Sequence, residues 1–357
     1  MNNSEFEKYL YPWQAEPWRQ LQARRASLPH ALLIHGPQYI AKQQLAMQFA
    51  SGLLCLNASA DGFACGVCRA CALIRAQSHP DFSVIQPEAE EANSGEDAER
   101  APSRARKPSR DIRVEQIRDM QRWMGVGAHQ GGWKIALVVP AEAMNRATAN
   151  ALLKTLEEPP PASLLILISH RPAQLLPTVR SRCQRLPCRA PEQSAALHWL
   201  EQAGVAQAAE RLALVGGLPL QALDPGPLQE IAAVLAELAA SAVRASSSSR
   251  ATNPAGAALD VARFSARLAA FPIASVIDLL HKWMCDLIAA RNALAPRFFV
   301  KQAEALRHLA SVLDSERMFE FELQLRRARA LADHPLNPRL VIDDLLIQWQ
   351  GLGVARR

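Results

Sequence analysis

The sequence lacks a membrane-length apolar run, and we expect no secretory leader. No stretch of its 357 residues approaches the roughly 18 consecutive apolar residues that a transmembrane helix needs. The opening residues, MNNSEFEKYLYPW, have neither the basic start nor the apolar centre of a signal peptide. We therefore expect a cytoplasmic protein. In that compartment the seven cysteines are not expected to form a disulfide framework.

Two further absences narrow the function. The sequence shows no Ser/His/Asp or Cys/His arrangement of a hydrolytic enzyme, and no stripe of alternating basic and aromatic residues that would mark a dedicated nucleic-acid surface. The net charge of +6 is weak support for a phosphate-rich partner, because many enzymes are equally basic. The length allows two or three globular domains.

Strand and helix patterns alternate over residues 1–190. Buried strands are predicted at residues 30–34, 134–139 and 164–169, and helices at residues 44–50, 112–124 and 145–158. The last of these helices must stop at the prolines that follow it. This alternation predicts an α/β domain with a parallel sheet.

The composition changes at Glu192, after which the chain is rich in Ala and Leu and shows helical periods alone. We predict a small helical lid domain at residues 191–225 and a helical collar or oligomerisation domain at residues 226–357, so the whole chain is α/β plus all-α. The charged stretch at residues 88–111 is predicted to be a flexible insertion, and the serine-rich stretch at residues 246–256 a linker or a long interhelical loop.

Four cysteines form the pattern C-x9-C-x2-C-x2-C, at Cys55, Cys65, Cys68 and Cys71. Four thiolates satisfy tetrahedral zinc and leave no open position, so the pattern predicts a structural Zn²⁺ site. An iron–sulfur cluster, a site with His79 as a ligand, and four buried thiols without metal are the alternatives. The remaining cysteines are predicted to be small core residues.

The stretch HGPQYIAKQQL, residues 35–45, has the layout of a phosphate-binding loop between a strand and a helix. Aligned with G-x-x-x-x-G-K-[ST], it keeps Gly36 and Lys42 but has Ala41 for the second glycine and Gln43 for the hydroxyl residue. We expect a degenerate, inactive cofactor-binding loop. The alternative for Lys42 is a solvated surface lysine.

The acidic residues of a nucleotide-hydrolysing site are also out of place. The strand at residues 134–139 ends in Pro140-Ala141 where Asp or Asp-Glu would hold magnesium. Glu142 comes two or three positions late. It is predicted to be a surface carboxylate at a helix start rather than a metal ligand.

Two motifs, read together with the cysteine cluster, carry a family resemblance. The stretches Asn150–Pro160, NALLKTLEEPP, and Thr178–Cys183, TVRSRC, resemble the bacterial replicative clamp-loader subunits of the AAA+ class. The resemblance extends from about Tyr11 to Leu340. It implies an AAA+ domain, a helical lid and a helical collar.

That family contains ATP-hydrolysing motors, gamma and tau, and a non-hydrolysing subunit. With Asn150 matched to the family's asparagine, the motors' acidic pair falls on Val139 and Pro140, and their later arginine falls near Pro219. Together with the altered loop, three nucleotide-handling elements are damaged, so the resemblance is to the non-hydrolysing subunit. Weak residual ATP binding through Gly36 and Lys42 stays open.

The resemblance also implies a role in trans. Arg182 is expected to be an arginine finger for a neighbouring ATPase subunit, or else an interface salt bridge, and Arg180 a surface or helix-capping residue. The implied partners are gamma/tau, delta, the sliding clamp and primer-template DNA, within a replicative polymerase holoenzyme in which this chain has no catalytic activity of its own.

Four apolar residues are predicted to face the collar interface or, equally, their own core: Val276, Leu279, Leu280 and Trp283.

Two rival interpretations stay open. The first is an active ATPase motor that works with Lys42 and uses Glu142 as its acid. The second is a DNA-binding protein with a zinc or iron–sulfur site, whose α/β domain is only a platform.

Overall fold

The computed structural model describes residues 10–88, 109–129, 132–246, 260–332 and 337–353. It divides into two compact units, Met1–Pro191 and Glu192–Arg357. Most of the predicted insertion and of the predicted linker lies outside the described residues.

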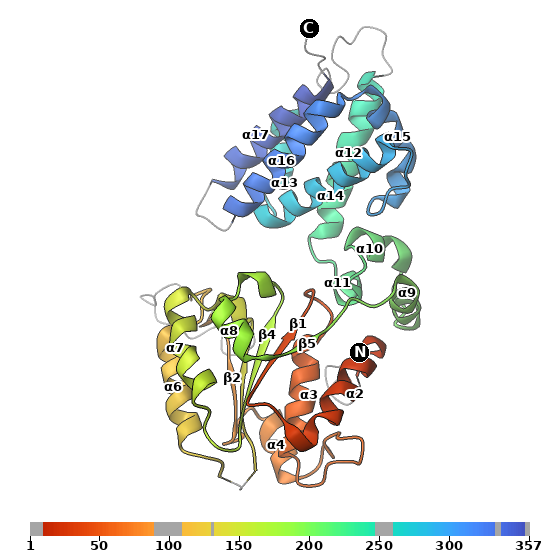
Figure 1. Cartoon of the computed structure of the whole chain (residues 1–357). Coiled ribbons are helices and arrows are strands. Elements are labelled where there is room, and N and C mark those ends of the chain that lie inside the picture. The colour runs from red at the N-terminus through yellow and green to blue at the C-terminus, as the bar shows by residue number, and fades with distance from the viewer. Residues whose placement is uncertain (1–9, 89–108, 130–131, 247–259, 333–336, 354–357) are drawn as a thin grey trace. The chain divides into compact units, whose positions relative to one another are not determined.

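The first unit is built on a parallel sheet with the strand order β2-β3-β4-β1-β5 (Figure 1). The strands are β1 (Ala31–His35), β2 (Phe82–Ile85), β3 (Lys134–Val138), β4 (Ser163–Ser169) and β5 (Gln184–Pro187). Every residue of β3 and β4 is buried, because helices cover both faces of the sheet. The predicted parallel α/β fold class is confirmed.

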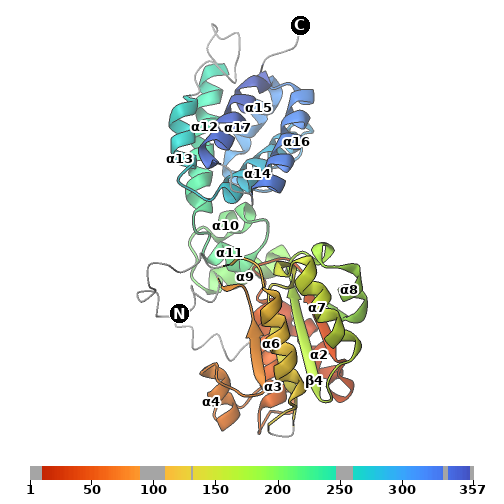
Figure 2. The ribbon, with the colours of Figure 1, turned by 90° about the vertical axis from the view of Figure 1, so that its left-hand side faces the viewer.

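Helices pack on each face of this sheet. α6 (Val114–Gly125), α7 (Arg146–Glu157) and α8 (Pro177–Arg182) lie on one face, onto which Figure 2 looks. α3 (Lys42–Leu54) lies on the other face, with α2 (Ala15–Ala23) and α4 (Arg69–Arg75) against it.

The strand register brings the functional loops to one edge of the sheet. His35 at the end of β1 lies opposite Ser169 at the end of β4, and Val138 at the end of β3 lies opposite Leu167. The carboxyl ends of parallel strands share an edge, which is where such sheets place their ligand sites. The short 3-10 helices η3 (Ala141–Ala143) and η4 (Pro172–Gln174) follow β3 and β4 at this edge.

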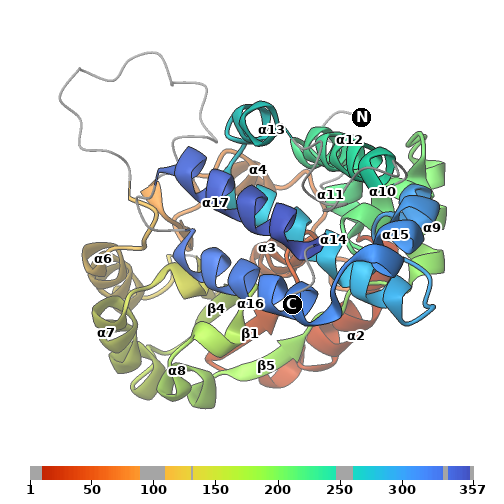
Figure 3. The same ribbon diagram turned by 90° about the horizontal axis from the view of Figure 1, so that it is seen from above.

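The second unit consists of helices around one apolar core. They are α9 (Gln193–Gln202), α10 (Ala208–Leu214), α11 (Pro219–Leu223), α12 (Leu228–Ser246), α13 (Val261–Leu268), α14 (Ile273–Arg291), α15 (Ala303–Val312), α16 (Ser315–Leu331) and α17 (Pro338–Gln350). Figure 3 looks down on them and shows α16 beside α17. Their core is continuous from Ala196 to Leu352. The predicted lid and collar boundary at residues 225 and 226 lies within this unit and stays a prediction.

The apolar stripe that was predicted for the collar interface lies inside this core. Val276, Leu279, Leu280 and Trp283 on α14 are at most 2% exposed. The interpretation of these four as interface residues is therefore wrong, and the alternative, that they form the core of their own domain, is confirmed. In the part of the chain that the structure describes, no helix is both long and apolar enough to cross a bilayer.

Candidate nucleotide and metal sites

Gly36 is required by the packing of the sheet. A Cβ atom on this residue would lie 1.9 Å from the backbone oxygen of Cys188, just after β5. The N–H of Gly36 donates to the carbonyl of Ser169 at 3.2 Å, and Cys188 donates to the carbonyl of His35 at 2.7 Å. Close approach of two backbones explains this glycine without any phosphate.

The loop before α3 has a glycine-like backbone at a position that is alanine. Ala41 has φ 61° and ψ 34°, in the left-handed region, immediately before α3 begins at Lys42. Tyr39 is also left-handed, with φ 61°. A non-glycine residue in this conformation costs roughly 1–2 kcal/mol. Tyr39 and Ala41 therefore adopt a backbone conformation that glycine would adopt at lower cost.

The Lys42 side chain forms a hydrogen bond within its own loop. Its ammonium donates to the carbonyl of Pro37, and the residue is 3% exposed, so the surface-lysine alternative is wrong. Burial lowers the pKa of Lys42 to about 8, while Cys188 and Glu142 nearby oppose that shift. Burial and this hydrogen bond hold the ammonium of Lys42 inside the loop.

The N-terminal segment ties down the same loop. The indole Nε1 of Trp13 donates to the carbonyl of Ile40 at 3.0 Å, and Nε2 of Gln14 donates to the carbonyl of Ala41 at 2.7 Å. Sequence reasoning missed both residues, because Pro12-Trp-Gln14 carries no pattern that reveals a distant backbone partner.

Glu142 joins two strand ends. Its Oε1 accepts the backbone N–H groups of His170, at 2.8 Å, and Arg171, at 3.1 Å, on the turn after β4. Within the described residues its Oε2 is buried without a hydrogen-bond partner. Glu142 is half-buried in the first turn of η3, so its predicted place at a helix start is confirmed, but the carboxylate is bound to backbone N–H groups rather than free at the surface. Glu142 fixes the turn between β4 and η4.

His170 lies beside this carboxylate as a neutral imidazole. Burial, together with the charge of Lys42, lowers the pKa of His170 to about 4, while Glu142 opposes the shift. The edge thus holds a buried lysine, a neutral histidine and a carboxylate whose first oxygen is already used.

Pro219 occupies the place where a motor's later arginine is expected. It is buried and is the first residue of α11, after Gly216 and Gly217 with φ of 79° and 88°. Proline is well suited to the first helical turn, where its missing N–H would have no helical partner. This position carries no charge for a nucleotide.

Arg182 stands in a different setting, at the last position of α8. Its Nη2 lies 2.7 Å from Oε1 of Glu157, its Nη1 donates to the carbonyl of Thr178 at 3.1 Å, and its side chain is 38% exposed. Arg180 instead is half-buried and donates to the carbonyl of Pro172, the first residue of η4, at 3.3 Å, and its capping role stays a prediction. Arg182 is thus accessible, whereas Arg180 is tied to the fold.

The four clustered cysteines converge. Sγ–Sγ distances are 3.8 Å for Cys55–Cys68, 3.5 Å for Cys68–Cys71, 3.7 Å for Cys71–Cys55 and 4.0 Å for Cys65–Cys71. Four sulfurs at about 2.3 Å from a tetrahedral zinc lie about 3.8 Å apart, so the spacing fits that ion. His79 is outside this group; its Nδ1 accepts the backbone N–H of Asp81 at 3.1 Å.

Backbone N–H groups donate hydrogen bonds to these sulfurs, which favours the thiolate form that binds a cation. The N–H of Cys65 lies 3.2 Å from Sγ of Cys55, and the N–H of Cys68 lies 3.3 Å from Sγ of Cys65. A backbone hydrogen bond from Cys71 lowers the pKa of Cys68 to about 6, whereas burial raises that of Cys71 to about 12. A metal ion would replace the protons on the thiols that hold them.

The cysteine loop is docked on α2. Phe63 stacks on Trp18 with ring centroids 4.5 Å apart, and the indole of Trp18 donates to the carbonyl of Asp61 at 3.2 Å. A metal held by the cysteines would therefore fasten α4 and this loop to α3, which ends just before Cys55.

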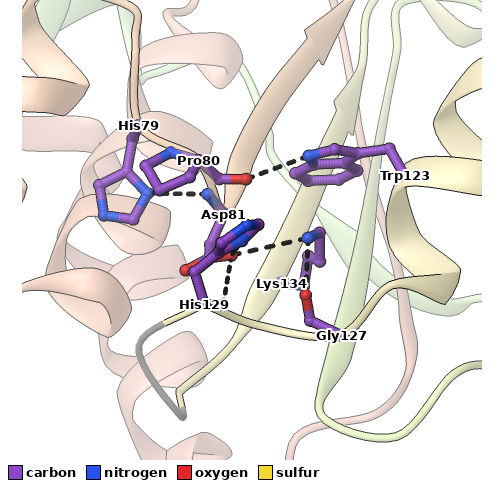
Figure 4. A network of polar contacts seen from close by, with 7 residues as sticks. All are labelled: His79, Pro80, Asp81, Trp123, Gly127, His129 and Lys134. Carbon is purple, nitrogen blue, oxygen red and sulfur yellow. Dashed lines mark hydrogen bonds and ion pairs between the residues drawn. The ribbon is translucent and has the colours of Figure 1, made fainter.

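A buried polar cluster occupies the opposite, amino-terminal edge of the sheet (Figure 4). Asp81 accepts the backbone N–H of His129 at 2.9 Å and lies 3.6 Å from Nζ of Lys134, which also donates to the carbonyl of Gly127. The ammonium of Lys134 sits 4.7 Å from the ring centre of Trp123. These groups satisfy one another and hold the loop before β3.

Comparison with known proteins gives one family. Residues 13–192 match the family described as DNA polymerase III, delta subunit. The DNA polymerase III subunit delta' of Pseudomonas aeruginosa is 36% identical over 96% of this chain and 98% of its own length. The subunit delta' of Escherichia coli is 33% identical over 60% of this chain and 59% of its own length.

Among solved structures, a DNA polymerase III gamma-subunit-related protein from Thermotoga maritima is similar to this chain at a TM-score of 0.42. Its sequence identity is 15%, over 94% of this chain and 99% of that one.

Proposed function

The chain belongs to the delta' family of DNA polymerase III clamp-loader subunits, and we propose that it has lost the nucleotide cycle while keeping the arginine that serves a neighbour. The observation that carries the first half is the state of Lys42, whose ammonium is buried against the Pro37 carbonyl. The altered loop, the displaced acid and Pro219 support the same conclusion.

The second half concerns Arg182, which is half-exposed at the end of α8. A permanently charged guanidinium binds two phosphate oxygens at once and stabilises the charge that develops during phosphoryl transfer. An arginine supplied in trans accelerates nucleotide hydrolysis by roughly 10³–10⁵ in other systems. Arg182 completes the ATP site of an adjacent gamma/tau subunit, in a ring that also contains delta and loads the sliding clamp on primed DNA.

A reconstituted complex tests this role. Arg182→Ala should lower ATP turnover by the motor subunits, whereas Arg189→Ala, which removes an exposed arginine outside α8, should leave it unchanged. Equal turnover in the Arg182 variant and the unaltered complex would contradict the finger.

The metal is part of the proposal. We infer that Cys55, Cys65, Cys68 and Cys71 hold structural Zn²⁺, because four thiolates close the coordination shell and the sulfur spacing suits a tetrahedral ion. The ion would lock the cysteine loop and take no part in phosphoryl transfer.

One observation favours a second candidate function. Oε2 of Glu142 and Nδ1 of His170 are buried and lack hydrogen-bond partners within the described residues. In an active ATPase these atoms would ligate magnesium or orient water. ATP hydrolysis by the isolated chain, abolished by Glu142→Gln, would establish that alternative.

A further inference from the structure

We propose that Glu157 is a positioning residue for Arg182, so that the α7 and α8 motifs form one functional unit. This inference rests on the proposed role of Arg182 as an arginine finger. It assigns a function to Glu157, the first glutamate of the LEEPP stretch, which has no role in the nucleotide site.

The contacts define how the guanidinium is held. Glu157 binds Nη2 of Arg182 at 2.7 Å, and the carbonyl of Thr178 accepts from Nη1 at 3.1 Å. A guanidinium carries five N–H donors in a rigid fork, so these two contacts leave further donors for phosphate oxygens. The Glu157 and Arg182 side chains are 51% and 38% exposed, which leaves room for a neighbouring subunit.

The placement of Glu157 is unfavourable for its own helix. It is the last residue of α7, where the negative end of the helix dipole repels a carboxylate. Arg182 ends α8, where the dipole favours a cation. Helix stability therefore does not account for Glu157, whereas its pairing with Arg182 does.

The frame between the two residues is rigid. Leu152 and Leu156 of α7 share a buried core with Val179 of α8, and each is at most 3% exposed. The carboxylate thus has a fixed position relative to the helix that carries the finger. Restricting a long arginine side chain before the phosphate arrives lowers the entropy that must be lost in the transition state.

Glu158 provides a matched control, because it is the adjacent exposed carboxylate at the end of the same helix. We would measure kcat and KM for ATP in the reconstituted complex with Glu157→Gln, Glu158→Gln, Arg182→Ala and the Glu157→Gln/Arg182→Ala double variant. Thermal melting of each isolated chain would confirm that it folds.

We expect Glu157→Gln to lower kcat about two- to fivefold, which at about 1.4 kcal/mol per tenfold corresponds to about 0.4–1 kcal/mol. KM for ATP should stay the same, Glu158→Gln should behave as the unaltered chain, and Glu157→Gln should cause no further loss once Arg182 is alanine. A merely structural role would lower turnover in both backgrounds.

The outcomes separate the two proposals. If Arg182→Ala lowers turnover and Glu157→Gln does not, the positioning role is wrong and the finger stands. Faster turnover with Glu157→Gln would also overturn positioning, because it would make the carboxylate a restraint on the finger. If Arg182→Ala has no effect, the proposed function fails, and the inference fails with it.

Discussion

Replacing Gly36 by alanine tests whether this residue is kept for the sheet rather than for phosphate. The new Cβ would lie 1.9 Å from the Cys188 oxygen, and Cβ contacts shorter than 3.0 Å essentially never occur, so the two backbones must separate by at least about 1.1 Å (3.0 − 1.9). That movement would break the 2.7 Å hydrogen bond from Cys188 to His35. Overpacking costs about 1–3 kcal/mol and the lost bond about 1 kcal/mol, so we expect a loss of about 2–4 kcal/mol.

Urea unfolding of the isolated chain, followed by circular dichroism, measures this loss in the free energy of unfolding. Ala41→Gly is the control, because it relieves a left-handed alanine while adding glycine's conformational entropy, and the two effects nearly cancel to within about 1 kcal/mol. A Gly36→Ala chain less than about 1 kcal/mol weaker than the unaltered one would refute the packing argument.

Two further predictions concern the metal and the buried polar cluster. Chelation should release close to one zinc per chain and speed hydrogen exchange in residues 55–71, while the β1 and β4 amides stay protected. A chain that is purified without metal and is unaffected by chelators would contradict the zinc site. Burial raises the pKa of Asp81, but the contacts with His129 and Lys134 outweigh burial and hold the pKa below its usual value. The ionised carboxylate therefore stabilises the folded state, and this stabilisation is lost as the pH falls below about 4. In Asp81→Asn, the melting temperature should fall less steeply as the pH is lowered below about 4. An unchanged pH dependence would contradict the stabilising role of the Asp81 carboxylate.

Sequence periodicity predicted the interior of the sheet better than its edges. The strands β1, β3 and β4 each contain a continuous apolar run, since both of their faces are covered. β2 at one edge is mostly half-buried, and β5 at the other reads Gln-Arg-Leu-Pro, with three exposed residues. Edge strands need fewer apolar side chains, so their sequences carry a weaker signal.

In the candidate sites, the sequence predicted the convergence of the four cysteines but not the contacts of the other residues. Their spacing was enough to predict that the four cysteines converge, because ligands separated by two residues can bind one ion. No local pattern could show that Lys42 turns onto Pro37, or that Glu142 binds the turn after β4, since those partners depend on the register of the strands. The pairing of Glu157 with Arg182 likewise joins two motifs that lie 25 positions apart (182 − 157).

The most direct test of the central claim is equilibrium binding of a fluorescent ATP analogue, with magnesium, to the purified zinc-loaded chain. The loop closed on Lys42 predicts no saturable binding up to the millimolar range. Saturable micromolar binding, lost in Lys42→Ala, would contradict the account and show that the phosphate loop still works.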